Sequence, residues 1–444
     1  MSFSIARKPE PPAPAAPAFA EQFTPKLVTM LREGYRARDF KADVISGLTV
    51  AIVALPLSMA LAIASGVTPD RGLYAAIVGG FLVSALGGSR FQIGGPAGAF
   101  IVLVAACVER HGVDGMLLAT VIAGLILVAI GVARLGTYIR YIPYPVTIGF
   151  TAGIAVIIFA SQIRDLLGLT LPGKEPGELI AKLKVLGTSI STASVAAIAI
   201  ALITLVIIQG LTRWRPTWPS MLIGLMVASL AAFFLGLPIE TIGTRFGDIP
   251  STLPAPALPL LSLEKIYAVL PDALAFALLG AIESLLSAVV ADGMAGRQHR
   301  SNIELVAQGI ANVGSALFGG ITVTGTIART ATNVRSGARG PVSGMLHSVF
   351  LLLFMLLAAP LARYIPLAAL AALLAGVAWN MAEKHAFAAL LRTSWVDAAA
   401  LLATFLLTIF FGLAEGIVAG TAIGLIGGKL LTNKGTAAPP NTPT

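Results

Sequence analysis

The residues of this sequence that could do chemistry are few, and they lie among apolar stretches. Glu283 stands inside the run ALLGAIESLLSAVVAD, and Arg329 ends the segment FGGITVTGTIAR at 318–329. A second glycine-rich segment, GGSRFQIGGPAGAF, occupies 87–100. The sequence contains no His/Cys cluster, nucleotide-binding loop or hydrolytic triad. We therefore expect no metal site, no cofactor and no enzymatic activity.

The two glycine-rich segments favour an anion site built from backbone. Each leads into an apolar stretch, 94–108 or 326–338, that is too short to cross a bilayer as one helix. Such half-helices would begin near the bilayer midplane, where their N-termini expose unpaired N–H groups and the positive end of the helix dipole. Two such ends facing each other bind an anion. The residues just before them, 90–94 and 321–324, would be extended and would pair as short strands.

Small and hydroxyl-bearing residues mark the start of each predicted half-helix. Gly95 lets the backbone approach a ligand closely, and Pro96 suits a first helical turn. Thr324, Gly325 and Thr326 stand at the second start, where the hydroxyls add hydrogen-bond donors. The alternative is that both segments are kinks packed against neighbouring helices. The matched pair favours a binding site.

Glu283 is the second candidate for function. An isolated charge at mid-bilayer costs about 3 kcal/mol on insertion scales, so this carboxyl must be protonated, paired or bathed in water. It could accept a proton or bind a cation beside the anion, and Ser287 lies one turn further on the same face. The alternative is a permanently neutral, hydrogen-bonded acid. Arg329 could pair with Glu283, attract the anion or extend to the inner surface.

The elements that must position these residues are membrane helices. The chain of 444 residues is 57% hydrophobic and 11% charged, whereas soluble domains carry roughly 25% charged residues. We predict an all-α polytopic membrane protein with about fourteen transmembrane segments of roughly bilayer length or shorter. They are placed at 43–64, 71–88, 94–108, 115–133, 142–163, 192–212, 218–237, 268–292, 301–318, 326–338, 341–360, 365–381, 395–411 and 413–431.

An internal repeat organises these segments. Gly95 and Gly325, at matching places in the two glycine-rich segments, lie 230 residues apart. The first and eighth segments, and the second and ninth, start at nearly the same offset. Because seven spans is an odd number, the second copy must be inverted in the membrane. Short, glycine-interrupted segments at matching positions of two such halves indicate a transporter site.

The ends of the chain and its charge give the topology. We expect disordered tails at 1–25 and 432–444, an interfacial or solvated cytoplasmic helix at 26–42, and a transmembrane domain at 43–431. The excess of Lys and Arg over alternate connections predicts that both termini are cytoplasmic in the cell (inner) membrane. The net charge of +9 therefore reflects membrane topology and not a nucleic-acid partner.

Residues 43–431 resemble the sulfate permease (SulP) family of anion transporters. The resemblance rests on ADVISGLTVAIVALPLSMALAIASG (42–66), PDRGLYAA (69–76), GGSRFQIGGPAGAF (87–100), ESLLSAVVAD (283–292) and TGTIARTATNVRSGAR (324–339). It implies a core domain, 43–133 and 268–360, that slides against a gate domain, 142–237 and 365–431, in an elevator-like motion. It also implies a possible homodimer. Family members usually continue into a cytoplasmic STAS domain, which is missing from this sequence.

The resemblance also implies which residues form the site. Substrate contacts fall on Pro56, Leu57, Ser58, Leu61, Gly95, Pro96, Ala97, Thr324, Gly325, Thr326, Ile327, Ala328 and Arg329, with Glu283 and Ser287 serving coupling. Many members carry Gln at Leu57 and an aromatic residue at Leu61. Sodium-coupled bicarbonate relatives carry Asp at Glu283 and a hydroxyl-bearing residue at Ile327. Ile327 removes a sodium ligand, which favours H+ over Na+ as the coupling ion.

These observations predict a secondary active transporter of small anions of the sulfate, bicarbonate or C4-dicarboxylate class, working by proton-coupled symport. Three alternatives stay open: a sodium-coupled bicarbonate transporter, a nucleobase transporter of the same architecture and an uncoupled anion channel. The expected partners are a small anion and membrane lipid.

Overall fold

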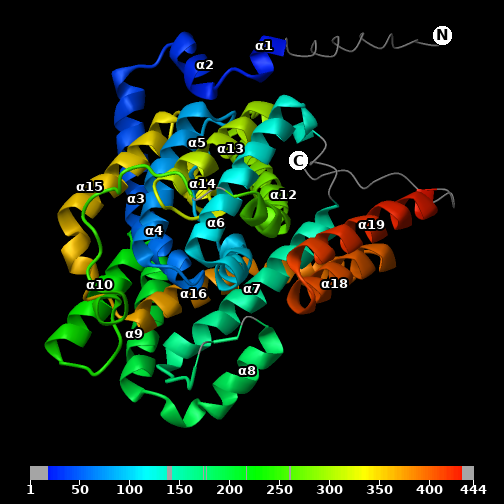
Figure 1. Ribbon diagram of the computed structural model, residues 1–444. Coiled ribbons are helices and arrows are strands. Elements are labelled where there is room, and N and C mark those ends of the chain that lie inside the picture. The colour runs from blue at the N-terminus through cyan, green and yellow to red at the C-terminus, as the bar shows by residue number, and fades with distance from the viewer. Residues whose placement is uncertain are drawn as a thin grey trace, which may run out of the picture.

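The computed structural model describes residues 19–137, 143–173, 175–176, 178–216, 218–259 and 262–432. Most of both predicted tails lies outside these residues. Within them, the fold is a bundle of helices (Figure 1) that also contains one two-stranded ladder.

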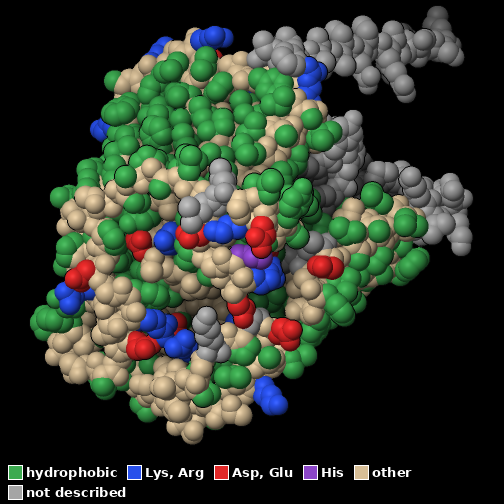
Figure 2. Space-filling view, in the orientation of Figure 1, with side chains coloured by type: hydrophobic (Ala, Val, Ile, Leu, Met, Phe, Trp, Pro, Cys, Tyr) green, Lys and Arg blue, Asp and Glu red, His purple; other side chains and the backbone are tan. Residues whose placement is uncertain are grey.

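Seven described helices, or runs of helix, are long and apolar enough to cross a membrane. They are α3 (Ala37–Ala64), the continuous run of η2 and α6 (Gly98–Val132), α7 (Tyr144–Leu167), α9 (Val195–Trp214), α12 (Leu263–Ala295), α15 (Val342–Ala362) and the run Leu367–Leu390, which holds α16 (Leu367–Met381) and α17 (Lys384–Leu390). On the visible surface, apolar side chains cover the upper part of the molecule and most charged side chains lie in a band below it (Figure 2). The predicted polytopic helical fold is confirmed.

The remaining predicted segments are shorter or interrupted helices. They are the consecutive α4 (Pro69–Tyr74), π-helix η1 (Ala75–Gly79) and α5 (Gly80–Leu86), followed along the chain by α10 (Ser220–Phe234), α13 (Ser301–Leu317), α14 (Ile327–Arg335), α18 (Trp395–Phe410) and α19 (Leu413–Thr432). Connecting helices α8 (Leu179–Thr188) and α11 (Ile242–Phe246) lie between membrane segments.

The helices pack in two groups. In one group α3 packs on α15, and α6 packs on α12 and α13. In the other, α7 packs on α16 and α18, α18 on α19, and α9 on α10. Between the groups, α3 contacts α10 and α16 less extensively. We call the first group the core and the second the gate, after the division expected from the sequence, and the contacts between them are fewer than those within each.

The N-terminal helix predicted at 26–42 is divided. Helix α2 (Lys26–Glu33) ends at Gly34, whose φ of 96° is a conformation that residues with a Cβ rarely adopt. Helix α3 then begins at Ala37, so the last six residues of the predicted segment belong to the first long helix. The sequence prediction missed this glycine as a helix end.

Helix α2 is fastened to the core. The Lys26 N–H donates to the Gly87 carbonyl at 2.9 Å, and Arg90 donates to the Glu33 carboxylate at 2.6 Å. This hydrogen bond holds the pKa of the exposed Glu33 carboxyl below its usual range. Short α1 (Phe19–Gln22) precedes α2 at the same end of the molecule (Figure 1).

Close packing of α6 on α13 depends on two facing glycines. A Cβ built on Gly124 would lie 2.6 Å from the Gly309 carbonyl oxygen, and a Cβ built on Gly309 would meet the Gly124 carbonyl in the same way. We expect Gly309→Ala to lower the stability of the folded protein by about 1–3 kcal/mol, since overpacking forces the helices apart. Thermal unfolding of the purified protein in detergent measures this effect.

The matched control is Gly293→Ala on α12, where an added Cβ has no atom within 4 Å. This variant should keep the parental Tm or exceed it slightly, because alanine favours helix. Equal melting temperatures for the two variants would show that the Gly124–Gly309 contact does not limit packing.

Candidate anion-binding site

The two glycine-rich segments meet in an antiparallel ladder. Strand β1 (Gly94–Gly95) pairs with β2 (Thr324–Gly325), with Gly94 opposite Gly325 and Gly95 opposite Thr324. The Thr326 N–H extends the contact by donating to the Ile93 carbonyl at 2.9 Å. The predicted pairing of the two segments is confirmed, and the polar backbone at this depth is satisfied by the pairing.

The ladder register reflects the inverted repeat. At an offset of 230 residues, Gly94 is equivalent to Thr324 and Gly95 to Gly325. Each residue therefore pairs with the equivalent of its neighbour, which places a local two-fold axis between the two pairs. A repeat inverted about an axis in the membrane plane produces this symmetry.

The helices that follow the ladder begin later than predicted. Gly94 and Gly95 are strand, and the first half-helix starts at Gly98 as a 3₁₀ turn that continues into α6 from Ile101. Pro96 and Ala97 lie between strand and helix, so Pro96 is not in a first helical turn as predicted. The reason is the ladder itself, which holds residues 94–95 extended. The predicted segments 94–108 and 115–133 form one run, broken at Gly112 with φ 68° and ψ −175°.

Two helix N-termini flank the ladder, because antiparallel chains leave it at opposite ends. Helix α14 starts at Ile327 after Thr326, and its first N–H groups have no partner within the helix. Ala328 is exposed and Ile327 half-buried, so this first turn borders open space. At the other start, a Cβ built on Gly98 would lie 3.2 Å from Met381 Sδ at the end of α16. The site therefore lies where core and gate meet.

Arg329 adds a full positive charge beside these helix ends. Its side chain is 1% exposed, and its Nη2 donates to Ser58 Oγ of α3 at 3.2 Å. Among the residues that the structure describes, its Nε and Nη1 have no hydrogen-bond partner, and Nη1 lies against Gly95, leaving no room for a Cβ there. Of the three interpretations left open by the sequence, pairing with Glu283 and extension to the surface both disagree with this geometry. Attraction of an anion agrees with it.

Glu283 lies on α12, and its side chain is 7% exposed. Within the described part of the chain, no hydrogen bond or ion pair joins its carboxyl to another residue. A cavity of about 380 Å³ runs past the adjacent Ile282 along α12 to Asp292 and is bounded by Thr147 of α7. Glu283 itself does not line this cavity, so its carboxyl is buried and unpaired among the described residues.

Ser287, predicted to act with Glu283 in coupling, makes its hydrogen bond with Thr330 of α14. Its hydroxyl donates to Thr330 Oγ1 at 3.1 Å, and Thr330 Oγ1 also accepts from the Ile93 N–H at 3.0 Å. Thr324 Oγ1 donates to the Gly280 carbonyl at 3.2 Å. These bonds fix the ladder and α14 to α12, the helix that carries Glu283.

The residues inferred on α3 are buried beside the site. Leu57, Ser58 and Leu61 are 8%, 0% and 3% exposed, and Pro56 is buried with them. Among these four, Ser58 is the one whose side chain hydrogen-bonds another predicted site residue, accepting from Arg329. Leu57 and Leu61 follow one turn apart and supply apolar surface.

A carboxylate that the sequence analysis did not single out accepts hydrogen bonds from the segment that leads into β1. Glu304 of α13 is fully buried and accepts from the N–H groups of Gly88 and Ser89 at 2.7 and 2.9 Å. Its other oxygen accepts from Gln92 Nε2 at 2.6 Å, and Gln92 Nε2 also reaches Ser284 Oγ at 2.8 Å. An acid within an apolar segment was the available signal, the same one that identified Glu283.

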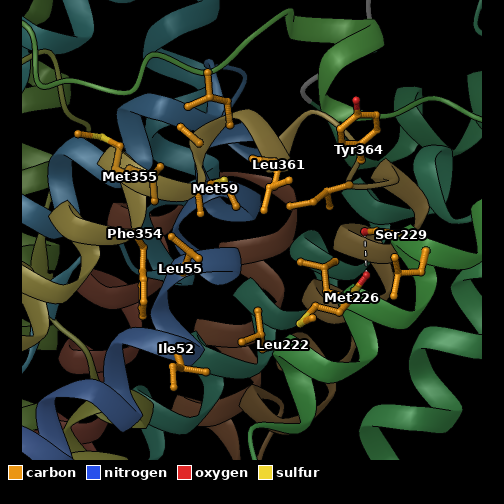
Figure 3. A pocket seen from close by; sticks show the side chains of 18 of the residues that line it. Ile52, Leu55, Met59, Leu222, Met226, Ser229, Phe354, Met355, Leu361 and Tyr364 are labelled. Atoms are coloured by element: carbon orange, nitrogen blue, oxygen red, sulfur yellow. Dashed lines mark hydrogen bonds between the residues drawn. The ribbon is translucent and has the colours of Figure 1, made fainter. Parts of the chain in front are cut away.

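A separate apolar cavity of about 560 Å³ lies between α3, α10 and α15. Figure 3 shows Ile52 and Leu55 of α3 facing Leu222 and Met226 of α10, with Phe354 of α15 beside them. None of the predicted site residues lines it. It lies between the two helix groups and is lined by none of the side chains that carry the predicted site.

Comparison with known proteins places these features in one family. Residues 40–404 match the model of the sulfate permease family. The chain is 44% identical over 401 residues to the putative sulfate transporter YvdB of Bacillus subtilis, covering 89% of this chain and 74% of that protein. It is 33% identical to the bicarbonate transporter BicA of Picosynechococcus sp., covering 78% of this chain and 61% of that protein's length.

Solved structures share the fold. The transmembrane domain of a cyanobacterial bicarbonate transporter BicA aligns with a TM-score of 0.77 and 32% identity, over 88% of this chain and 98% of that one. The murine Solute Carrier 26 family member A9 anion transporter aligns with a TM-score of 0.85 at 18% identity, over 97% of this chain and 77% of that one.

Proposed function

The chain belongs to the sulfate permease family, so it is a membrane transporter of small anions and not an enzyme. We propose that it is a proton-coupled anion symporter. The observation that carries the proposal is the pairing of β1 with β2, which brings two helix N-termini and the Arg329 guanidinium to one place. An anion at this point would accept from backbone N–H groups and from Arg329 Nε and Nη1.

We propose sulfate as the first substrate to test, since the 44%-identical relative is named a putative sulfate transporter. Bicarbonate follows, from the BicA relatives. Backbone donors and one guanidinium select charge more than shape, so C4-dicarboxylates stay in the set.

Glu283 is the proposed proton acceptor. Its carboxyl is buried and has no partner among the described residues. Moving one negative charge inward costs about 2.3 kcal/mol per 100 mV of inside-negative potential, and a proton carried on Glu283 would offset it. Ile327, at the start of α14, offers no side-chain oxygen to a sodium ion, which favours H+.

The proposed motion is a slide of the core, with the site, against the gate. It is supported by the position of the site at the core–gate boundary, where Gly98 faces Met381 of α16. In the cell membrane, both termini would be cytoplasmic, and the transporter would assemble as a homodimer.

The test is uptake of labelled sulfate, bicarbonate and fumarate into proteoliposomes, each with and without an inward proton gradient. We expect at least one anion to accumulate against its own gradient only when the proton gradient is present. Uptake that follows a sodium gradient would indicate sodium coupling, and unsaturable current without accumulation would indicate a channel. Uptake of uracil but of none of the three anions would overturn the assignment in favour of a nucleobase transporter.

A further inference from the structure

A buried histidine next to the site has no role in the mechanism above. His347 lies on α15 and its side chain is 0% exposed. Among the described residues its ring nitrogens have no side-chain partner, and the Gly344 carbonyl, one turn earlier on α15, makes only a weak contact with the ring. Buried polar atoms are almost always paired, so an imidazole without a well-formed hydrogen bond in a packed core calls for a ligand, a water molecule or a proton.

The turn of α15 that carries His347 lies beside the ladder, because a Cβ built on Gly80 would meet both the Gly94 carbonyl oxygen of β1 at 2.8 Å and the hydroxyl of Ser348, the next residue, at 2.9 Å. His347 is also close enough to Arg329 for their charges to interact, and Arg329 Nε and Nη1 have no partner among the described residues. Protonation of His347 alone would place a second positive charge beside the guanidinium in a space closed to bulk water. An anion bound at Arg329 would supply the negative charge that makes this protonation favourable.

The other elements packed around His347 add little charge. Helices α5 and η1, which contact α15, contain no titratable residue. On α3, the facing residue Gly47 carries no side chain, and the nearest acid along that helix is Asp43, one turn further. The charge state of His347 is therefore governed mainly by Arg329 and by what binds there.

Buried polar side chains extend from one end of the core to Ser343, one turn before His347 on α15. At that end the Tyr35 hydroxyl donates to Asp43 at 2.7 Å. One turn along α3, Ser46 donates to Asn333 Oδ1 at 2.6 Å, and Asn333 Nδ2 donates to Ser343 Oγ at 2.9 Å. Ser343 precedes His347 by one turn of α15, and all of these side chains except that of Tyr35 are buried. In the proposed topology this end faces the cytoplasm.

We propose that His347 is a second proton-binding group of the transport site, which takes up its proton together with the anion. The inference rests on the proposed proton-coupled function and adds to it a stoichiometry of two protons per divalent anion. A divalent anion carried with one proton moves one net negative charge inward, at a cost of about 2.3 kcal/mol per 100 mV. Protons on both Glu283 and His347 cancel both charges of such an anion.

The experiment counts protons on binding. Sulfate is titrated calorimetrically into the purified, full-length protein near neutral pH, in two buffers of different ionisation enthalpy. We expect the parental protein to take up about one more proton per bound sulfate than His347→Gln, because the amide cannot be protonated in this range. The matched control is His385→Gln on α17, an exposed histidine whose loss should leave the proton count unchanged.

A second measurement observes His347 in the parental protein itself, and a variant is needed only to assign its signal. In protein labelled with 15N-histidine, the four imidazoles give separate signals that His347→Asn assigns. Addition of sulfate should move the His347 signal of the parental protein from the neutral to the protonated form. Equal proton counts in parental and variant proteins, or a His347 signal that stays neutral with sulfate bound, would overturn the proposal while the transport function stands. Failure of sulfate, bicarbonate and fumarate all to bind would instead overturn the transport function.

Discussion

Glu283→Gln should remove the share of anion accumulation that one coupled proton supplies. A pH step of one unit stores about 1.4 kcal/mol per proton, which corresponds to about tenfold accumulation for each proton carried. Glutamine keeps the shape of the side chain but cannot take up a proton. In proteoliposomes with an inward gradient of one pH unit, we expect steady-state accumulation to fall about tenfold, while exchange of labelled for unlabelled anion without a gradient continues.

Glu264→Gln is the matched control for this experiment. Glu264 lies in the first turn of the same helix, α12, and is exposed. Its neutralisation leaves the site untouched, so accumulation should equal that of the parental protein. If gradient-driven accumulation survives Glu283→Gln unchanged, Glu283 is not the coupling acid, and the unpaired carboxyl needs another explanation.

Arg329→Gln should weaken anion binding by about 10- to 100-fold, the equivalent of about 1.5–3 kcal/mol for a charge-assisted hydrogen bond. The substitution removes the positive charge and the two open N–H groups that face the helix ends. It also leaves Ser58 Oγ without its donor. Binding of sulfate to purified protein, measured by calorimetry or by protection against thermal unfolding, gives the affinity directly.

Arg335→Gln tests whether the effect belongs to the site. Arg335 is the last residue of the same nine-residue helix and is exposed. A general loss of positive charge would weaken binding in both variants alike. We expect Arg335→Gln to bind sulfate with parental affinity, and equal losses in the two variants would contradict a specific role for Arg329.

The ladder could be predicted from the sequence because it repeats a local signal. Two glycine-rich segments, each followed by an apolar stretch too short to span, required buried extended backbone that only mutual pairing satisfies. The first short segment, predicted from 94, begins as helix four residues later at Gly98, and the second, predicted from 326, begins one residue later at Ile327. How many residues the ladder holds extended depends on pairing between segments about 230 residues apart, which the sequence alone does not fix. Pro96 was assigned to a helical turn for the same reason.

The surroundings of the site were less predictable. Three positions for Arg329 were open because its neighbour, Ser58, lies 271 residues away on another helix. Glu304 and His347 were not singled out, although each is an ionisable residue within an apolar segment. What they do depends on tertiary contacts, a hydrogen-bonded cradle for Glu304 and unpartnered nitrogens for His347.

The symmetry of the β1–β2 pair has a consequence for biosynthesis. While a ribosome makes the stretch from Gly95 to Thr324, the first strand has been inserted into the bilayer with its backbone amides uncapped. Water, lipid headgroups or an insertion chaperone must hydrogen-bond or cover the backbone of β1 until β2 has been synthesised. Neither half of the polypeptide, produced alone, would hold an anion, and co-expression of the two halves would be needed to restore it.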